Sequence, residues 1–195
     1  MSGSAEKPQR PPFIIEVAST EEKVQACFDV RVEIFVVEQG FDVDSELDEY
    51  EPISSSLLLS VTQPSPPPES TSSLSPTSLD PEAPPSKKPI GTVRFTPSIG
   101  KISRLAILKD YRQYGFGKEL MLAVEQHARE HKAEDLAGAT RDAEEGEGKV
   151  YRLKLHSQMP VVPFYAKLGF RKEGPEFDEE GAPHQKMIKD IKIAS

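Results

Sequence analysis

The sequence predicts an α/β fold, mixed in the α+β sense, in which short apolar strands alternate with a few amphipathic helices. Two observations support this class. Leu120, Val124 and Ala128 recur at i, i+4 and i+8 after a glycine-containing turn, which is the spacing of one helix face. Elsewhere, short apolar runs are bounded by glycine, proline or serine, as strands are. In chain order we expect strand, helix, loop or helix, three strands, helix, strand, helix and two strands.

The first helix follows a polar segment and one strand. Residues 1–12 are polar and contain proline, which predicts a disordered tail. Residues 13–17 form a strand-like run, and Ser19 with Glu22 three positions later matches a capping box. The helix is expected to end near Gly40. One face of it is traced by Val24, Cys27, Phe28, Arg31 and Phe35.

The stretch 41–51 is rich in carboxylates, and no Lys or Arg occurs between Arg31 and Lys87. Two interpretations have equal weight. Such a run is commonly a solvated loop, because unpaired carboxylates repel one another. Alternatively, it forms a wall that attracts a cationic substrate, with Asp42 and Asp44 as candidate substrate-binding residues.

A low-complexity Pro/Ser segment at 63–89 lies between the strand-like runs 56–61 and 90–95. Its composition predicts a disordered loop inserted between two neighbouring strands, so residues 13–195 form a single domain. A second, acidic loop is expected at 138–149. Further strands are expected at 150–156, 170–177 and 184–191.

The turn 112–118 has the composition of an anion-binding site. A strand-like run precedes it, Gly115 and Gly117 are spaced by one residue, and a helix begins at once. Free N–H groups at a helix start favour a phosphate, and glycine lets the backbone approach it. The Ser/Thr of a P-loop and the third glycine of a dinucleotide fingerprint are missing, because Glu119 and Leu120 stand there. We therefore expect a pyrophosphate site of another kind.

Composition excludes several function classes. A formal charge of −8 without a basic run argues against nucleic-acid and anionic-membrane partners. The single cysteine, Cys27, excludes a disulfide framework and is expected to be a buried structural thiol. The N-terminus has no apolar core of a signal peptide. The expected location is the cytoplasm, with access to the nucleus by diffusion.

Two motifs resemble the GNAT superfamily of N-acyltransferases. Arg112, Gly115 and Gly117 match its Arg/Gln-x-x-Gly-x-Gly/Ala signature, and 164–170, Phe-Tyr-Ala-Lys-Leu-Gly-Phe, is similar to its Tyr-x-x-x-Gly-Phe element. Residues 35–39 and 179–187 resemble the ElaA-like branch. The resemblance implies a mixed, mostly antiparallel sheet of six to seven strands flanked by about four helices, with splayed parallel strands 4 and 5.

The same resemblance implies acetyl-CoA as co-substrate and no metal. The expected cofactor-binding residues are Leu105, Ala106, Ile107, Arg112, Gln113, Tyr114, Gly115, Phe116, Gly117 and Lys118. The N–H of Ile107 is expected to hold the thioester carbonyl. Because many relatives pair through their C-terminal strands, a homodimer is compatible with the resemblance.

N-acetylation needs a neutral amine and a proton for the departing thiolate. Tyr165 is the expected general acid, and Glu38 the expected base or amine anchor. His184 is expected to line the acceptor site, His156 to be a proton relay or a surface residue, and His127 and His131 to lie on an exposed helix face.

The expected reaction is direct attack by the primary amine of a small cationic acceptor: an amino sugar such as glucosamine, a polyamine or an arylalkylamine. The alternatives are a protein Lys or N-terminal acetyltransferase and a non-catalytic CoA-binding regulator.

Overall fold

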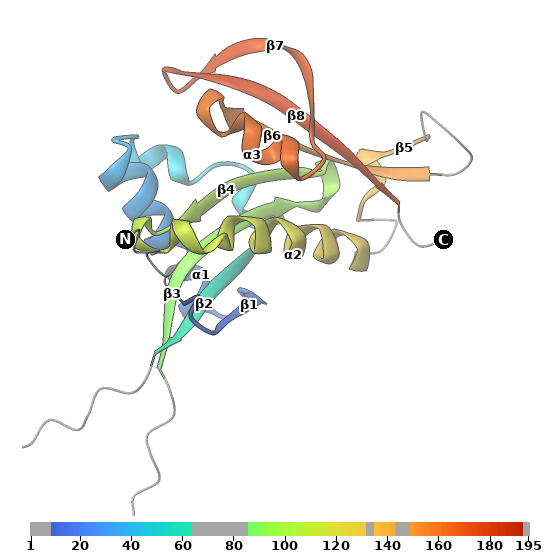
Figure 1. Ribbon diagram of the computed structural model, residues 1–195. Helices are drawn as coiled ribbons and strands as arrows, with labels where there is room; N and C mark the ends of the chain where they lie inside the picture. The colour runs from blue at the N-terminus through green and yellow to red at the C-terminus, as the bar shows by residue number, and fades with distance from the viewer. Residues whose placement is uncertain (1–8, 64–85, 132–134, 143–148, 193–195) are drawn as a thin grey trace, which may run out of the picture.

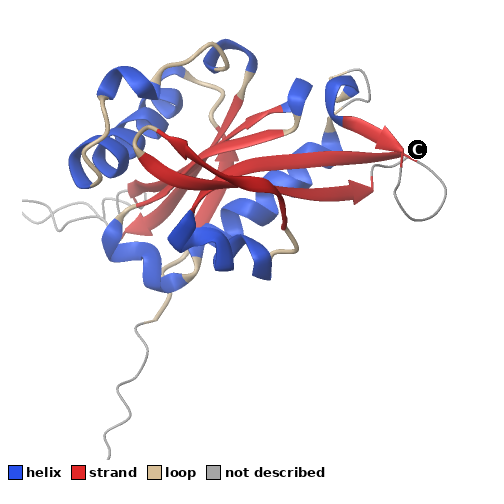
Figure 2. Ribbon diagram, turned by 90° about the horizontal axis from the view of Figure 1, so that it is seen from above, coloured by secondary structure: helices blue, strands red, loops and turns tan. Residues whose placement is uncertain are grey.

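The computed structural model describes residues 9–63, 86–131, 135–142 and 149–192 as one sheet with helices on both faces (Figures 1 and 2). The strands in sheet order are β1 (Phe13–Val17), β2 (Ser55–Gln63), β3 (Ser86–Thr96), β4 (Lys101–Ile107), β6 (Lys149–Gln158), β8 (Ala182–Lys192) and β7 (Arg171–Glu179), and β5 (Thr140–Asp142) pairs with β6. Strands β4 and β6 are parallel and the other pairs antiparallel. The predicted mixed, mostly antiparallel sheet is confirmed. The described residues contain one strand more than expected, because β5 lies in the segment predicted as an acidic loop.

Helices α1 (Glu21–Arg31) and α2 (Phe116–Glu130) cover opposite faces of the sheet (Figure 2). A π-helix, η1 (Val32–Glu38), continues α1, and α3 (Val162–Lys167) precedes β7. Short 3-10 turns complete the described helices: η2 (Val43–Glu46), η3 (Glu51–Ile53), η4 (Pro97–Ile99), η5 (Lys109–Tyr114), η6 (Ala137–Ala139) and η7 (Met159–Val161).

Strand β4 contributes to both layers, because successive side chains point to opposite faces of a sheet. Ala106 packs with Val30 and Ile34 of the first helix, whereas Ile107 joins the main core on the α2 side. Helix α2 packs on this main core through Leu120, Val124 and Ala128, all of them inaccessible to solvent. The predicted apolar face of α2 is therefore the face that packs on the sheet.

The start of α1 differs from the prediction by one residue. Thr20, with an extended backbone, is the N-cap, and its hydroxyl accepts a hydrogen bond from Lys23 N–H at 3.4 Å. The expected cap was Ser19. The face predicted for this helix is also partly wrong, because Val24 is 46% exposed while Cys27 is buried.

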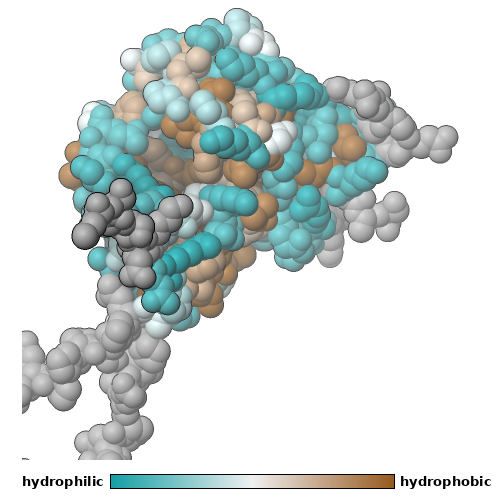
Figure 3. Space-filling model, in the orientation of Figure 1, coloured by the Kyte–Doolittle hydropathy of each residue, from teal (hydrophilic) through white to brown (hydrophobic). Residues whose placement is uncertain are grey.

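The parallel strands β4 and β6 separate soon after they meet. Their described pairing is the bridge Lys101↔Lys154, next to the hydrogen bond from Lys154 N–H to Gly100 O. Beyond it the strands diverge, and Figure 3 shows the molecule hollowed on this side between the β7–β8 hairpin above and α2 below. This splayed pair opens the sheet at the C-terminal end of β4.

Parts of both predicted loops, 63–89 and 138–149, are strand in the structure. Gln63 and Ser86 pair at the ends of β2 and β3, so 86–89 of the predicted Pro/Ser loop are strand, and 64–85 lie outside the described residues. Of the predicted acidic loop, 140–142 and Lys149 are strand and 143–148 lie outside the description. Residues 1–8 of the tail also lie outside it, whereas Arg10 contacts Glu119 and the ring of Phe116. Across the described ranges, every helix is too short or too polar to cross a membrane.

Candidate functional site

The turn between β4 and α2 leaves the start of α2 open. Gly115 has φ +74°, a left-handed conformation that glycine adopts without strain, and no side chain caps the helix there. A Cβ at Gly115 would meet nothing within 4 Å, and one at Gly117 would meet only the Phe164 ring, at 3.4 Å. The protein's own packing therefore leaves space around both glycines. Helix N–H groups with this access suit a phosphate or diphosphate.

Arg112 is fixed at this turn by two partners. Its Nη1 and Nη2 donate to Oε1 and Oε2 of Glu38, each at 2.7 Å, and its Nε donates to Ile107 O at 3.0 Å. The hydrogen bonds from Arg112 hold the pKa of the Glu38 carboxyl below its usual range. Both Glu38 oxygens are engaged by Arg112, and the lowered pKa makes this carboxylate a weaker base than a free glutamate. In this structure Glu38 orients Arg112, and its role as base or amine anchor stays a prediction.

The other residues expected at the cofactor lie along β4 and its turn. Leu105 lines a cavity described below, Tyr114 packs on Phe116 with ring centroids 5.8 Å apart, and Gln113 and Lys118 are exposed. Leu108 N–H donates to Ile90 O across β3. In an antiparallel pair alternate residues direct their N–H groups to opposite edges, so Ile107 N–H is directed toward the gap before β6.

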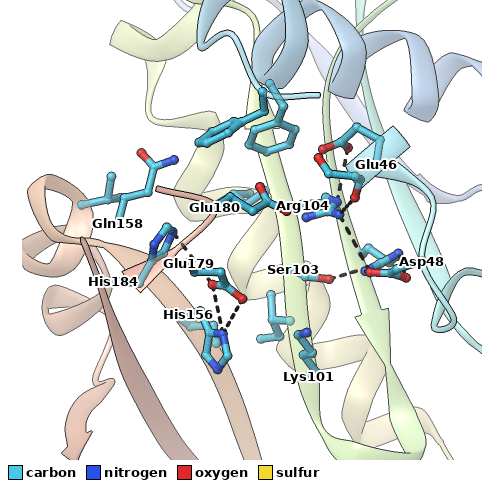
Figure 4. Close-up of a pocket in the computed structure, with 18 of the residues that line it drawn as sticks. Glu46, Asp48, Lys101, Ser103, Arg104, His156, Gln158, Glu179, Glu180 and His184 are labelled. Carbon is cyan, nitrogen blue, oxygen red and sulfur yellow. Dashed lines mark hydrogen bonds and ion pairs between the residues drawn. The ribbon is translucent and has the colours of Figure 1, made fainter. Parts of the chain in front are cut away.

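A cavity of about 320 Å³ occupies the gap between the splayed strands (Figure 4). Tyr165 of α3 lines it and is 8% exposed. Burial raises the pKa of the Tyr165 phenol, so the hydroxyl remains protonated at neutral pH. None of the described groups forms a hydrogen bond with this hydroxyl. A protonated phenol facing a cavity is available to donate to a ligand.

Two histidines and a glutamate line the opposite wall of the cavity. Glu179 Oε1 accepts from His156 Nδ1 at 3.0 Å, and its Oε2 lies 4.0 Å from His184 Nε2 (Figure 4). The hydrogen bond from His156 lowers the pKa of the Glu179 carboxyl, so it is ionised near neutral pH. His184 is 8% exposed, and its Nδ1 lies 2.9 Å from Ala182 O. The structure brings His184 and Tyr165 together at one cavity, and His156, the expected relay or surface residue, lies with them.

A network of three arginines pairs with Glu46, Asp48 and Glu51 of the acidic stretch that follows η1. Arg31 binds Glu46 and Glu51, and Arg94 binds Asp48 and Glu51, at N···O distances of 2.6–2.9 Å. Glu46 also lies 3.3 Å from Arg104 Nε. Burial alone would raise the pKa of Asp48, but hydrogen bonds from Arg94 outweigh it and the pKa is lowered. Both interpretations of this stretch omitted these partners, which come from α1, β3 and β4.

The network was missed because its arginines are distant in sequence. One signal was available: Arg94 stands inside the apolar run of β3, where a charged residue is rarely buried without a partner. Glu46, Asp48, Arg94 and Arg104 all line the cavity. In Figure 4, Glu46 and Asp48 lie on the side of the cavity opposite His184.

Asp42 and Asp44, expected at the substrate, are exposed and do not line this cavity. Asp42 Oδ1 accepts from Asp44 N–H at 3.0 Å and caps η2. The prediction of exposed His127 and His131 is incorrect, because both rings pack on Phe95, at 6.0 and 5.7 Å between centroids. Cys27 is 1% exposed, as expected of a structural thiol.

Comparison with known proteins gives a consistent result. Residues 82–191, more than half of the chain, match the sequence model described as "Acetyltransferase (GNAT) domain". The uncharacterized N-acetyltransferase YjcF of Bacillus subtilis is 29% identical over 177 residues, which are 89% of this chain and 97% of YjcF.

Two solved structures share the fold. The structure of Escherichia coli ElaA superposes with a TM-score of 0.61 at 16% identity, covering 91% of this chain and 99% of ElaA. An acyl-CoA N-acyltransferase of Pseudomonas aeruginosa gives 0.55 at 17% identity, covering 91% and 98%.

Proposed function

The chain belongs to the GNAT family of acetyltransferases and is an N-acetyltransferase, and we propose that it transfers the acetyl group of acetyl-CoA to the primary amine of a small cationic acceptor. The observation that carries the proposal is that β4 connects two places: residues 101–105 of this strand line the cavity that holds Tyr165, and the turn around Gly115 follows the strand's C-terminal end. A diphosphate group and a reacting thioester could bind at these two places at once.

The residues at the turn fit coenzyme A. The N–H groups of Phe116 and Gly117 would bind the diphosphate, with Lys118 nearby, and a Cβ at Gly115 would project into the space the ligand needs. Bound acetyl-CoA supplies the acyl group as a thioester. The Ile107 N–H would hold the thioester carbonyl oxygen, and Tyr165 would donate a proton toward the sulfur.

Direct attack by the amine, without an acyl-enzyme, is supported by the described groups around the cavity. Cys27 is a buried residue of α1 and does not line the cavity. Ser103 Oγ accepts a hydrogen bond from Arg94, and Ser45 Oγ donates to Asp42 O. Both serines are thus engaged in structural hydrogen bonds, and among the described residues neither hydroxyl is hydrogen-bonded to a histidine or a carboxylate that would activate it.

The cavity volume of about 320 Å³ favours a small acceptor, because it lies at the low end of small-molecule sites. The carboxylates of Glu179 and Glu180 line it and would attract an ammonium group. An amino sugar such as glucosamine, a polyamine or an arylalkylamine fits this description. A cytoplasmic location and a homodimer remain predictions from the sequence.

The test follows free-thiol release from acetyl-CoA with glucosamine, spermidine, tyramine and a lysine peptide, alongside calorimetric binding of CoA. Turnover with one of the small amines supports the proposal. Turnover with the peptide alone would favour a protein acetyltransferase. Binding of CoA without turnover of any acceptor would favour a regulator, and absence of CoA binding would refute the assignment of the turn.

A further inference from the structure

We propose that His184 takes the proton from the acceptor's ammonium group, and that Glu179 stabilises the resulting imidazolium and links it to His156 at the mouth of the cavity. The inference deepens the proposed function and rests on it. It assigns to β8 and β6 the proton acceptor that was expected at Glu38.

The tautomer of His184 follows from its backbone partner. A carbonyl oxygen only accepts, so His184 Nδ1, 2.9 Å from Ala182 O, must carry a hydrogen. In the neutral ring Nε2 then bears the lone pair, and this nitrogen faces Glu179 at 4.0 Å. That separation is longer than a hydrogen bond. Nε2 is therefore free to accept a proton from a ligand in the cavity.

Glu179 stabilises the positive charge on His184 and is not itself the group that accepts the ammonium proton. Its oxygens lie 3.0 and 3.1 Å from His156 Nδ1, which must donate because the carboxylate is ionised. A carboxylate beside Nε2 favours the imidazolium over the neutral ring. The ring of Phe177 packs against both histidines, with centroids 4.8 Å from His156 and 6.2 Å from His184.

The titratable groups that line the cavity with His184 come from several elements. Glu179 and Glu180 belong to β7 and its turn, His156 to β6, Lys101 and Arg104 to β4, and Tyr165 to α3. Glu46, Asp48 and Arg94 of the arginine network also line it. Lys101 opposes the imidazolium, but its ammonium lies over the Tyr50 ring, 4.8 Å from the centroid. Arg104 is matched by Glu46. Glu179, with Oε2 4.0 Å from Nε2, is therefore the carboxylate that faces the His184 ring.

The proton balance closes. The net reaction converts R–NH₃⁺ and acetyl-CoA into R–NH–acetyl, CoA thiol and one H⁺. The first ammonium proton passes to His184 Nε2 and leaves to water by way of the half-exposed side of the cavity at His156. The nitrogen pair forms the C–N bond as the C–S bond breaks. The second nitrogen proton replaces the one that Tyr165 gives to sulfur.

The experiment compares H184Q, H184A, E179Q and E176Q with the wild type, using the best small amine of the panel. Glu176 lies exposed on the same hairpin and serves as the matched control. We expect H184Q to lower kcat/KM for the amine about 100-fold and to remove the acid limb of its pH profile. CoA binding should stay unchanged. E179Q should move that limb to lower pH, because the imidazolium loses its carboxylate, and E176Q should leave it in place.

Imidazole added to H184A should restore turnover at least about 10-fold with saturation, because the deleted ring leaves space for it. The proposal is overturned if H184Q keeps the acid limb and a rate within about threefold of wild type. It is equally overturned if H184A binds CoA but is not rescued. These outcomes differ from failure of the proposed function, in which the wild type itself turns over none of the amines.

Discussion

Single residues at the cavity have separable roles in binding and in proton transfer. Tyr165 combines a buried ring with an unpartnered hydroxyl among the described groups. The ring packs on Phe164 and Phe170, with centroids 5.0 and 6.0 Å away. The hydroxyl contributes nothing to this packing, so its removal should change chemistry and leave the fold intact.

We therefore expect Tyr165→Phe to lower kcat by about 100-fold, the smaller end of general-acid effects, while the dissociation constant for CoA stays the same. Steady-state kinetics with calorimetry checks this. Tyr111→Phe is the control, because Tyr111 packs beside Tyr114 and does not line the same cavity. If Tyr165→Phe turned over at the wild-type rate across the pH range, the assignment of the acid would be wrong.

Gly115 has a backbone conformation that favours glycine, and it lies where we propose that the diphosphate binds. An alanine at φ +74° costs about 1 kcal/mol of stability, and its Cβ would enter the space proposed for the diphosphate. We expect Gly115→Ala to raise KM for acetyl-CoA at least about 10-fold. Gly174→Ala is matched in strain, with φ +72° and nothing within 4 Å of its Cβ, and lies in β7.

Comparison of the two variants separates strain from binding. Both should lose similar stability in urea unfolding, and only Gly115→Ala should lose affinity for CoA. Equal KM values in the two variants would show that the turn does not contact the cofactor.

At the scale of elements, the connection from η1 to β2 is fixed by its arginine partners. Arg94 is 1% exposed and binds two carboxylates of this connection. Its loss would leave the partly buried Asp48 without its main cation and Glu51 with Arg31 as its remaining partner in this network. Breaking such a pair costs about 3 kcal/mol, the low end of the usual range, because both carboxylates keep some contact with water.

We expect Arg94→Gln to lose that amount in urea unfolding at pH 7, with a pH dependence of defined sign. The folded pKa of Asp48 is lowered, so its contribution is present above the unfolded value of ~3.9 and is lost as the pH falls through the folded value. Glu51 behaves likewise. The wild type should thus lose more stability than Arg94→Gln on acidification below pH ~5.

Arg129→Gln is the control, because Arg129 is exposed, lies 3.5 Å from Glu125, and leaves that carboxylate its second partner, Lys189. A variant of Arg94 as stable as this control would mean that the network does not hold the connection.

The arginine network could not be predicted from the sequence, unlike several local features of the fold. Local patterns predicted the α2 face, the glycine turn, the strands around it and the Tyr165 helix, since each depends on residues close in the chain. The partners of Glu46 and Asp48 come from α1, β3 and β4, up to 58 positions away for the Glu46–Arg104 pair. No local pattern encodes such pairing. The same holds for Glu38, whose partner Arg112 lies 74 positions away, and for the meeting of His156, Glu179 and His184.

For the whole molecule, the splayed sheet offers two places for a long ligand. One is the route proposed here, from the Gly115 turn along β4 to Tyr165. The other is a larger cavity of about 610 Å³ on the α1 face, lined by Val30, Ile34, Leu108 and Tyr111. Volume alone would favour the second. The first has the open helix N-terminus and the protonated phenol, which are the groups that a diphosphate and a thioester need.

Hydrogen exchange distinguishes the two routes across the entire chain. With CoA we expect slower exchange of amides in peptides covering 105–107 and 115–118, because the ligand binds both the edge of β4 and the start of α2. Pantetheine, which lacks the diphosphate, should protect 105–107 and leave 115–118 unchanged. Peptides from 26–37 and 86–90 serve as reporters of the larger cavity and should not change with either ligand. Protection confined to these reporters would place coenzyme A on the α1 face and separate its thioester from Tyr165, contradicting the arrangement on which the proposed transfer depends.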